Sequence, residues 1–466
     1  MSSLFNGSMG QSGVDTGDIP ASLRFRSGSY LTRTPGSSDS RRLLTLSMWV
    51  KRVALGVFQR TFGADDVGST TFCVGFNTNN KLEIRDYSGS YLIQGVSTQV
   101  FRDTTSWIHV VVAFDTNQTT FSSAVKAYVN GVQITAWDTS TYSGTHDMQI
   151  NDTRKQSFGV YLASGVPSVP YDYSLDYLAR SCLVTGSQLT PTSFGYLNTE
   201  INEWVSKSQA QVKAVVDAGG TNSFMLDFDD GTSLTTLGYD KSSKGNNWTL
   251  NNFSLTAGTS YDRMLDVPGN SFPTFNAIEY AVNTFSDGNL KCVTSAGGSY
   301  TSGCTQFFPA TGKWYAEVTD TTEANTQIGI VAAGYSGLTQ LANQPSGYSY
   351  YATSGNKYNN GTAVAYGATY TSGDVIGVIF DADNGKLYFS KNGVVQNSGD
   401  PVAGTGYAYN GLTGTYCIAV GDGGASAATL NLNCGQAPLH ASATYDSASG
   451  GYFRYTPPSD YKALCQ

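Results

Sequence analysis

The sequence predicts an all-β protein made of two antiparallel β-sandwiches in tandem, joined by a partly helical connector. Short runs rich in Val, Thr, Tyr and Phe alternate with Gly- and Asn-containing turns along most of the chain. Convincing helical spacing occurs in one stretch, residues 197–220. The 466 residues also exceed one typical domain of about 100–200 residues, so more than one core is expected.

Charged residues are scarce in this chain. They form 13% of it, with a net charge of −8, whereas about 25% is usual. Hydroxyl and amide side chains must therefore form much of the polar surface. An acidic chain lacks the basic footprint that phosphate binding requires, so we expect no nucleic-acid partner. No apolar run approaches the roughly 18 to 20 residues of a membrane helix, so we expect no membrane insertion.

Residues 1–20 are polar and rich in Gly and Ser, and they predict an N-terminal tethering arm. The opening MSSLFNGSMGQSG has neither the basic nor the apolar region of a signal peptide. We therefore expect synthesis in the cytoplasm without export. Seven widely spaced cysteines suggest neither a disulfide framework nor a zinc site. Buried thiols are favoured, while a Cys292–Cys304 bridge stays open.

Residues 21–196 predict the first sandwich. Strand-like runs occupy 46–50, 71–76 and 82–85. The nearly continuous apolar run WIHVVVAFD at 107–115 predicts a strand buried on both faces. Asn130-Gly131 within VKAYVNGVQIT supplies the positive φ angles of a tight hairpin.

Residues 197–270 are interpreted as the connector between the sandwiches. Its helix is predicted from an apolar series that ends at Gly219-Gly220. The rest is expected to be extended and packed between the two domains, with Trp248 as a buried anchor. The series comprises Ile201, Trp204, Val205, Val212, Val215 and Val216.

Residues 271–440 predict the second sandwich, with strands at 312–320, within 373–395, and at 417–423 and 428–433. Asn384-Gly385 and Asn392-Gly393 are hairpin-turn signals within it. Residues 441–466 contain Pro457-Pro458 and predict an extended C-terminal segment, because proline removes ladder donors.

Both blocks resemble known folds. SMWVKR (47–52), WIHVVVAFD…VKAYVNGVQIT (107–135) and LDYLARSCLVTGSQLTPTSFG (175–195) are similar to a laminin-G or pentraxin-type concanavalin-like sandwich. That resemblance implies that Trp49 and Trp107 face the core. GKWYAEV (312–318), IGI (328–330) and GDVIG (373–377) resemble a B30.2/SPRY sandwich, which Asp381 and the 387–393 hairpin continue.

Four stretches, 22–52, 244–258, 357–378 and 455–464, resemble recurring segments of phage structural proteins. The resemblance implies a virion protein on the exterior of the tail or capsid, synthesised in the bacterial cytoplasm. We favour a tail fibre that recognises host-surface glycan or protein. It further implies that arm 1–20 contacts other virion proteins and that copies form a homo-oligomer, with a trimer favoured. The alternatives are a capsid-decorating or head-fibre protein, a glycan-cleaving concanavalin-like enzyme, and a surface adhesin.

A glycan-cleaving enzyme of this fold would require paired carboxylates. Glu317, Asp320 and Glu323 lie in EVTDTTE, but an odd spacing places Glu317 and Asp320 on opposite faces of a strand. They cannot then flank one glycosidic bond, so we expect no catalytic residues. His109 lies within an apolar strand without a nucleophile motif, which favours a packed core histidine.

The run YSYYATSGNKYNNG (348–361) is the candidate binding segment. Tyrosine rings offer flat apolar faces, and amides offer paired donors and acceptors that suit a sugar. Tyr350 and Tyr358 could equally be ordinary strand residues. The candidate surface residues are Tyr348, Tyr350, Tyr351, Tyr358, Asn359 and Asn360, with Asn356 beside them.

Calcium is the one cofactor that the sequence leaves open. Laminin-G-like sandwiches often bind Ca²⁺ at a rim through oxygen ligands. Asp65 and Asp66 in a loop, and Asp115 and Asn117 after a strand, are the candidate ligands. Their spacing is not that of a specific calcium motif, and solvated turn residues are the favoured interpretation.

Overall fold

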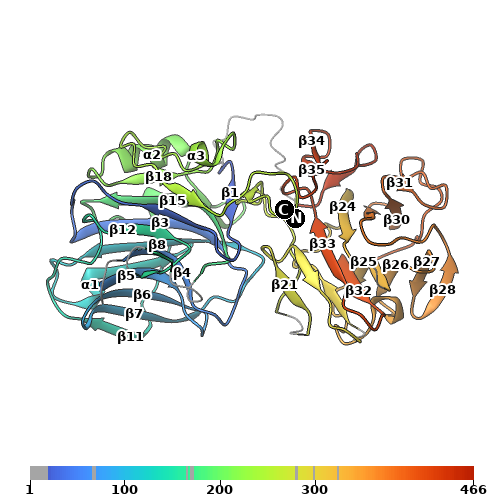
Figure 1. The fold of residues 1–466 in the computed structure, drawn as a ribbon, viewed down its shortest axis with the longest axis horizontal. Helices are drawn as coiled ribbons and strands as arrows, with labels where there is room; N and C mark the ends of the chain where they lie inside the picture. The colour runs from blue at the N-terminus through green and yellow to red at the C-terminus, as the bar shows by residue number, and fades with distance from the viewer. Residues whose placement is uncertain are drawn as a thin grey trace. The chain divides into compact units, whose positions relative to one another are not determined.

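The protein is described by a computed structural model for residues 19–65, 70–163, 166–167, 173–278, 282–297, 300–322 and 325–465. The chain divides into two compact units (Figure 1). Of the described residues, the first unit holds 19–255 and 262–269, and the second holds 256–261 and 270–465. The all-β prediction is confirmed, because both units consist mainly of antiparallel sheets.

The first unit contains two eight-stranded sheets. One has the order β10-β9-β8-β3-β15-β1-β20, with β18 also paired to β15. Its strands are β1 Ser22–Arg24, β3 Leu43–Lys51, β8 Trp107–Asp115, β9 Val125–Val129, β10 Val132–Gln133, β15 Tyr177–Thr185, β18 Phe224–Leu226 and β20 Arg263–Met264.

The other sheet of this unit has the order β11-β7-β6-β5-β4-β12-β2-β19. Its strands are β2 Tyr30–Arg33, β4 Gln59–Asp65, β5 Thr70–Phe76, β6 Lys81–Ser88, β7 Tyr91–Val100, β11 Trp137–Tyr142, β12 Lys155–Phe158 and β19 Thr249–Asn251. Smaller elements are α1 Phe121–Ala124, β13 Leu162–Ala163, β14 Val166–Pro167 and η1 Pro191–Ser193.

Strand β8 is buried on both faces, as its continuous apolar run predicts. Val110, Val112 and Phe114 belong to the main sandwich core. Val111 points to the other face and joins a second cluster with Val212 and Val216. These two valines lie on α2 (Gln209–Asp217), which covers this face of the sheet.

The expectation that Trp49 and Trp107 face the sandwich core is wrong. Met48 and Val50 are in the main core, so strand alternation directs Trp49 to the opposite face. There Trp49 stacks on His109, with ring centroids 4.7 Å apart. Trp107 shares this outer face, because residues 107 and 109 are two apart on β8.

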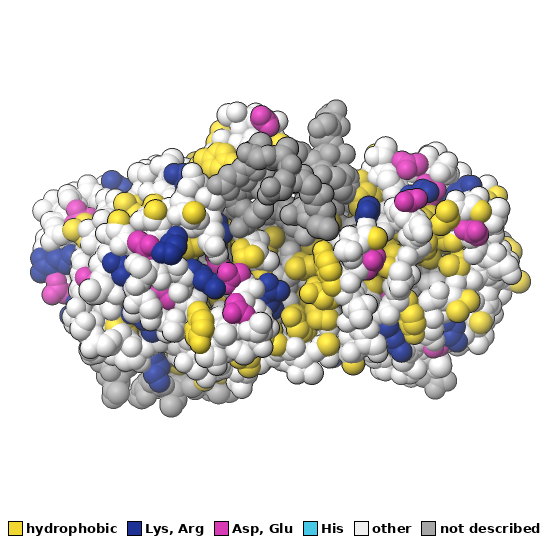
Figure 2. All heavy atoms as spheres, turned by 90° about the horizontal axis from the view of Figure 1, so that it is seen from above, with side chains coloured by type: hydrophobic (Ala, Val, Ile, Leu, Met, Phe, Trp, Pro, Cys, Tyr) yellow, Lys and Arg dark blue, Asp and Glu magenta, His cyan; other side chains and the backbone are white. Residues whose placement is uncertain are grey.

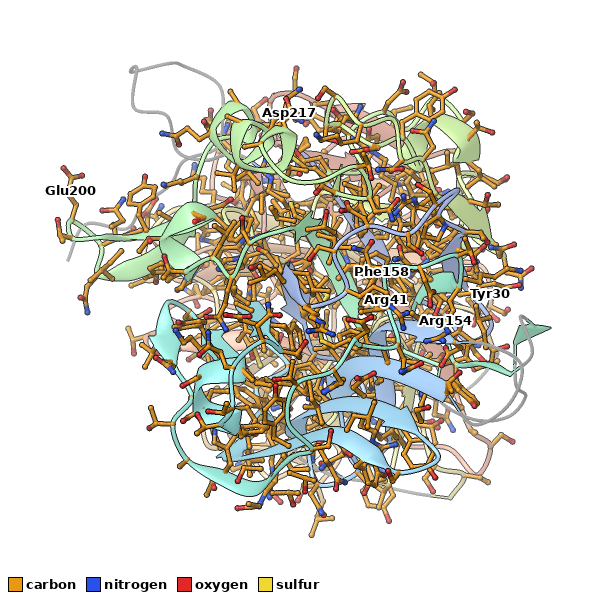
Figure 3. The ribbon with its side chains drawn as sticks, turned by 90° about the vertical axis from the view of Figure 1, so that its left-hand side faces the viewer. Tyr30, Arg41, Arg154, Phe158, Glu200 and Asp217 are labelled. Atoms are coloured by element: carbon orange, nitrogen blue, oxygen red, sulfur yellow. The ribbon has the colours of Figure 1, made fainter. Side chains whose placement is uncertain are left out.

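Residues 197–255 are part of the first unit rather than a connector packed between domains. Residues 195–206 form a hairpin of β16 (Gly195–Asn198) and β17 (Glu203–Ser206), where a helix was predicted. The helix begins only after Ser208, whose hydroxyl accepts from the Gln211 amide in a capping box. Figure 3 shows Glu200 at the projecting tip of the hairpin and Asp217 at the end of α2.

Trp248 is a buried anchor, as expected, but it anchors its segment to the first sandwich. Its ring centroid lies 4.9 Å from that of Phe158 and 5.0 Å from that of Phe224. The following strand β19 pairs with β2, and α3 (Leu234–Leu237) precedes it. A short helix and aromatic packing therefore bind this segment to the sandwich.

Residues 262–269 are bound to the first unit through buried ion pairs. Asp262 accepts from Arg26 Nε at 2.6 Å, and Arg24 lies 3.4 Å away. Asp266 lies 2.8 Å from the Lys51 ammonium, and both side chains are almost fully buried. Trp107 Nε1 donates to the second oxygen of Asp266 at 2.9 Å. Charges removed from water in this way require such partners.

The second unit contains an eight-stranded and a six-stranded sheet. The first has the order β21-β22-β33-β24-β29-β30-β31, with β36 parallel to β24. Its strands are β21 Thr284–Ser286, β22 Lys291–Val293, β24 Lys313–Asp320, β29 Val375–Asp381, β30 Lys386–Lys391, β31 Val394–Val395, β33 Thr429–Asn433 and β36 Lys462–Ala463.

The six-stranded sheet has the order β23-β32-β25-β26-β27-β28. Its strands are β23 Thr301–Gly303, β25 Thr326–Ala332, β26 Gly347–Tyr351, β27 Asn356–Asn359, β28 Thr362–Ala365 and β32 Tyr416–Asp422. The short helix η2 (Leu341–Asn343) precedes β26. The predicted strands at 312–320, 373–395, 417–423 and 428–433 are thus confirmed within one or two residues at their ends.

The predicted extended C-terminal segment is not a free tail. It contains a hairpin of β34 (Thr444–Asp446) and β35 (Gly451–Phe453), and β36 pairs with β24. The backbone N–H groups of Arg454 and Tyr455 donate to the Glu317 carboxylate at 3.0 and 2.9 Å. The segment is therefore built into the second sandwich by a buried side chain.

Six of the seven cysteines are buried. The bridge between Cys292 and Cys304 that the sequence left open is not formed. Burial raises the pKa of the Cys73 thiol to about 11 and that of Cys292 to about 12. Within the part of the chain that the structure describes, no helix has the length and apolarity needed to span a membrane.

Candidate functional site

The candidate binding segment, residues 348–361, forms strands β26 and β27, which together with β28 lie at one edge of the second unit's six-stranded sheet (Figure 1). Strand β26 pairs with β27, and β27 pairs with β28. Asn360 and Gly361 form the turn between β27 and β28 with φ angles of 50° and 72°. The Asn359 amide supports this turn by donating to the Gly347 carbonyl at 2.8 Å and to the Pro345 carbonyl at 3.0 Å.

Strand alternation divides the four candidate tyrosines between two faces. Tyr350 is fully buried, with its ring stacked on Phe389 at a centroid distance of 5.6 Å. Tyr348 shares that face and packs against Tyr409 at 5.0 Å. Tyr351 lies on the opposite face, because it neighbours Tyr350 in the strand.

Tyr350 is therefore a core residue rather than a surface-binding residue. Its hydroxyl donates to the Ala368 carbonyl, and its own carbonyl accepts from the Tyr370 hydroxyl at 2.9 Å. Burial raises the pKa of Tyr350 well above its usual value. The sequence could not tell which face of this strand is buried, because Tyr348, Tyr350 and Tyr351 lie in one strand without a charged residue.

Tyr351 and Tyr358 form a ring pair on the outer face of the sheet, with centroids 5.0 Å apart. Tyr358 is opposite Ser349 in the ladder, which places it on the same face as Tyr351. Both side chains are half-buried. Burial, and next the neighbouring Tyr358, raises the pKa of Tyr351, while a hydrogen bond with Gln327 lowers it. The pair thus combines partly exposed aromatic faces with hydroxyl groups.

Amide side chains lie next to this tyrosine pair. Gln327 Nε2 donates to Gln340 Oε1 at 3.4 Å, and Gln327 Oε1 accepts from the Ala342 amide at 2.7 Å. Sequence reasoning did not identify Gln327 or Gln340, because they come from β25 and from the loop before η2. Asn360 is exposed at the far end of the β27–β28 hairpin.

The described candidate calcium ligands, Asp65, Asp115 and Asn117, form hydrogen bonds within the protein. Asp65 is buried, pairs with Arg60 at 2.8 Å, and accepts from the Thr71 hydroxyl at 2.6 Å. Asp115 accepts from the amide of Asn117 at 2.9 Å, in a local turn. Asp66 lies outside the described residues. No group of three or more His, Cys, Asp or Glu side chains suited to a metal is found among the residues that the structure describes.

The carboxylates considered for catalysis have structural partners. Glu317 is buried, and the Tyr315 hydroxyl donates to it at 3.2 Å in addition to the two C-terminal backbone amides. Asp320 accepts from the Thr326 hydroxyl at 2.6 Å, and burial raises its pKa to about 6. Glu323 lies outside the described residues. Glu317 and Asp320 therefore share no hydrogen-bond partner.

His109 is a buried residue with both ring nitrogens hydrogen-bonded, as its apolar strand predicts. Trp204 Nε1 donates to His109 Nδ1 at 2.9 Å, so the proton of a neutral ring must be on Nε2. Nε2 is 2.8 Å from the Ser47 hydroxyl, to which it then donates. The hairpin β16–β17 supplies Trp204, which stacks over the ring. This environment has no position for a substrate.

The surroundings of the three histidines shift their pKa values in different directions. Burial lowers the pKa of His109 to about 3, whereas the Asp86 carboxylate 2.9 Å from His146 raises the pKa of that ring despite its partial burial. Burial lowers the pKa of His440. In nitrogen-15 NMR spectra recorded from pH 8 to 4, His109 should stay in its neutral form throughout, and His146 should protonate above pH 6.5.

The pH effect of His109 on stability follows from the same shift. Below pH 6.5 the unfolded chain binds a proton that folded His109 does not, so this residue lowers the stability as the pH falls from 6.5 towards 3. A midpoint of His109 titration near 6.5 would contradict the buried, doubly bonded ring.

On the face drawn in Figure 2, basic side chains are scattered among uncharged and acidic ones rather than gathered into a stripe. A stripe of basic residues is the electrostatic footprint of nucleic-acid binding. The charges on this face therefore do not favour that function.

Comparisons with known proteins identify two domains. Residues 25–160 match the family model of the concanavalin A-like lectin/glucanases superfamily, in its Laminin_G_3 form. Residues 313–435 match the SPRY domain. These two matches confirm the laminin-G-like and SPRY resemblances, and such domains fit a role in ligand binding or recognition.

Similar solved structures each cover a part of the chain. The SPRY domain of human HERC1 is 15% identical, with 34% of this chain and 96% of that chain covered and a TM-score of 0.28. The TRIM65 PSpry domain is 18% identical, with coverages of 34% and 91% and a TM-score of 0.28. A SAP-like pentraxin from Limulus polyphemus is 12% identical, with coverages of 37% and 79% and a TM-score of 0.28. No curated protein matches the chain.

Proposed function

We propose that this chain, in which a laminin-G-like concanavalin-type domain precedes a SPRY domain, is a non-enzymatic recognition protein on the exterior of a phage particle. Its most favoured place is a tail fibre. The first 20 residues would contact other virion proteins, and the sandwiches would present a surface to glycan or protein on the host envelope. Several copies acting together would multiply weak contacts.

The observation that carries this proposal is the tyrosine pair Tyr351 and Tyr358 beside amide side chains. Aromatic faces can pack against the apolar face of a sugar ring, and the partly exposed amide of Gln340 can satisfy its hydroxyl groups, while buried Gln327 holds Gln340 in place. The acidic side chain of Asp422 lies close enough to raise the pKa of Tyr351. We therefore favour an uncharged glycan over an acidic one.

The proposal is tested with the full chain on an array of bacterial envelope polysaccharides and on whole cells. Tyr351→Ala and Tyr358→Ala should each weaken binding about tenfold or more, since buried aromatic anchors dominate recognition surfaces. Tyr445→Ala is the matched control. Its ring also pairs with a tyrosine, Tyr452, at 5.1 Å, and it is 50% exposed. This control should bind as the unchanged protein does.

Three outcomes would contradict the proposal. Equal loss in the Tyr445→Ala control would remove the tyrosine pair from the interaction. Binding to empty capsids but not to cells would favour capsid decoration. Release of sugar from the array would favour a glycan-cleaving enzyme.

A further inference from the structure

Strand β28 is the least protected edge strand among the four large sheets in the part of the chain that the structure describes. The sheets end at β10 and β20, β11 and β19, β21 and β31, and β23 and β28. Strands β10, β20 and β31 have two residues each, and β19, β21 and β23 have three. Very short edge strands offer little backbone to a partner. Only β11 and β28 in this group are longer.

Strand β11 carries two features that prevent edge-to-edge pairing. Its register shifts between Trp137 and Thr139, as in a β-bulge, and it carries a charged residue, Asp138, that pairs with Lys81. Strand β28 has the sequence Thr-Ala-Val-Ala, without charge, proline or an irregular register. All four of its residues are exposed, with Val364 at 48%.

The hairpin geometry leaves backbone groups of β28 directed outward. Asn359 and Thr362 flank the two-residue turn and form a hydrogen-bonded pair, as in any two-residue hairpin. Alternation then directs the N–H and C=O groups of Val364 towards β27, and those of Ala363 and Ala365 away from it. Two donors and two acceptors therefore face outward in a pattern that another strand can match.

We infer that β28 pairs with β28 of a second copy of this chain, in an antiparallel arrangement about a two-fold axis. The segment between Lys357 and Asp374 has no charged residue. The edge strand itself therefore carries no charge that would repel a second copy, although Lys357 is opposite Val364 in the ladder and the whole chain carries −8. In this arrangement Val364 is opposite Val364 of the second copy. The backbone of Ala363 then hydrogen-bonds to the backbone of Ala365 in the second copy, and Ala365 bonds to Ala363 of that copy in the same way. The strand is its own complement.

This contact makes one continuous sheet from the two six-stranded sheets and closes at two copies. It predicts a dimer in place of the trimer that the phage resemblance implies. The inference rests on the sheet edge and does not depend on glycan recognition. Its success or failure is therefore separate from that of the proposed function.

Sedimentation velocity of the full chain over a series of concentrations tests the inference. The unchanged protein should show a monomer–dimer equilibrium. Ala363→Pro removes an outward N–H without removing a bond to β27, and should raise the dimer dissociation constant about tenfold or more. Val364→Lys places two like charges opposite each other and should have a similar effect.

Val394→Lys is the matched control, since Val394 lies on the edge strand β31 and is 67% exposed. It should leave the dissociation constant unchanged, and circular dichroism checks that each variant is folded. Three results would overturn the inference: a monomer at every concentration, a trimer, or a dimer that resists both β28 variants.

Discussion

Replacing Asp266 with alanine should lower the free energy of unfolding of the first unit by about 4 kcal/mol, because removing one partner of a buried ion pair leaves the other charge uncompensated. The Lys51 ammonium lies 2.8 Å from Asp266, and the side-chain exposures are 0% and 1%. The Trp107 indole N–H would lose its acceptor as well. Urea denaturation followed by far-ultraviolet circular dichroism measures the change.

The exposed pair Lys213 and Asp217 provides the control for this variant. Their side chains are 41% and 28% exposed, and they lie one helical turn apart on α2. Lys213→Ala should change the free energy of unfolding by less than about 0.5 kcal/mol, since it removes only this exposed pair and leaves the hydrogen bond from the Ser243 N–H to Asp217 in place. The double variant Lys51→Met with Asp266→Leu should recover part of the loss, because it removes both buried charges but still leaves the Trp107 N–H without its acceptor. Equal effects of Asp266→Ala and Lys213→Ala would show that burial does not determine the cost.

Glu317→Ala should destabilise the second unit by about 2 to 3 kcal/mol, because buried donors would lose their acceptor. The donors are the backbone N–H groups of Arg454 and Tyr455 and the hydroxyl of Tyr315. Hydrogen exchange should show faster exchange of the two backbone amides. Glu317→Gln keeps one carbonyl acceptor and should have a smaller effect.

Glu200→Ala is the control for a glutamate without this role, because Glu200 is exposed in the β16–β17 turn. It should stay within about 0.5 kcal/mol of the unchanged protein. If Glu317→Ala left the exchange of the Arg454 and Tyr455 amides unchanged, the carboxylate would not hold the C-terminal segment.

The pKa shift of Glu317 gives its effect on the pH dependence of stability a definite sign. Burial raises its pKa above 4.5, although four hydrogen bonds oppose the shift. The folded chain therefore binds this proton more tightly than the unfolded chain. The contribution of Glu317 to stability falls as the pH rises from 4.5 through the folded-state pKa. Glu317→Gln should remove this part of the dependence.

Local sequence was sufficient where a pattern had one structural solution. The apolar run at 107–115 predicted a doubly buried strand, and β8 is one. Local sequence was insufficient to predict the structure at Ile201, Trp204 and Val205, because their spacing suits a helix as well as a hairpin. Asn202, with a φ of 56°, lies in a turn, and the helix begins only after the capping box at Ser208. The decisive contact, from Trp204 to His109, spans 95 residues.

The candidate site shows the same division between what local sequence predicts and what it does not. The sequence identified the tyrosine- and asparagine-rich run, because composition is local. It could not tell that Tyr350 faces the core while Tyr351 and Tyr358 face outward. That assignment requires the register between β26 and β27, and a shift of one residue exchanges the faces. It also could not place Gln327 and Gln340 beside Tyr351.

By itself, the sequence determined that this chain is all-β, where most strands run, and that it contains laminin-G-like and SPRY domains. Only the tertiary structure decided that residues 197–255 cover the first sandwich, that Glu317 holds the C-terminal segment, and which tyrosines face outward. The physical reason is that periodicity and turn residues act over a few positions. Burial, pairing register and ion pairs depend on residues far apart in the chain.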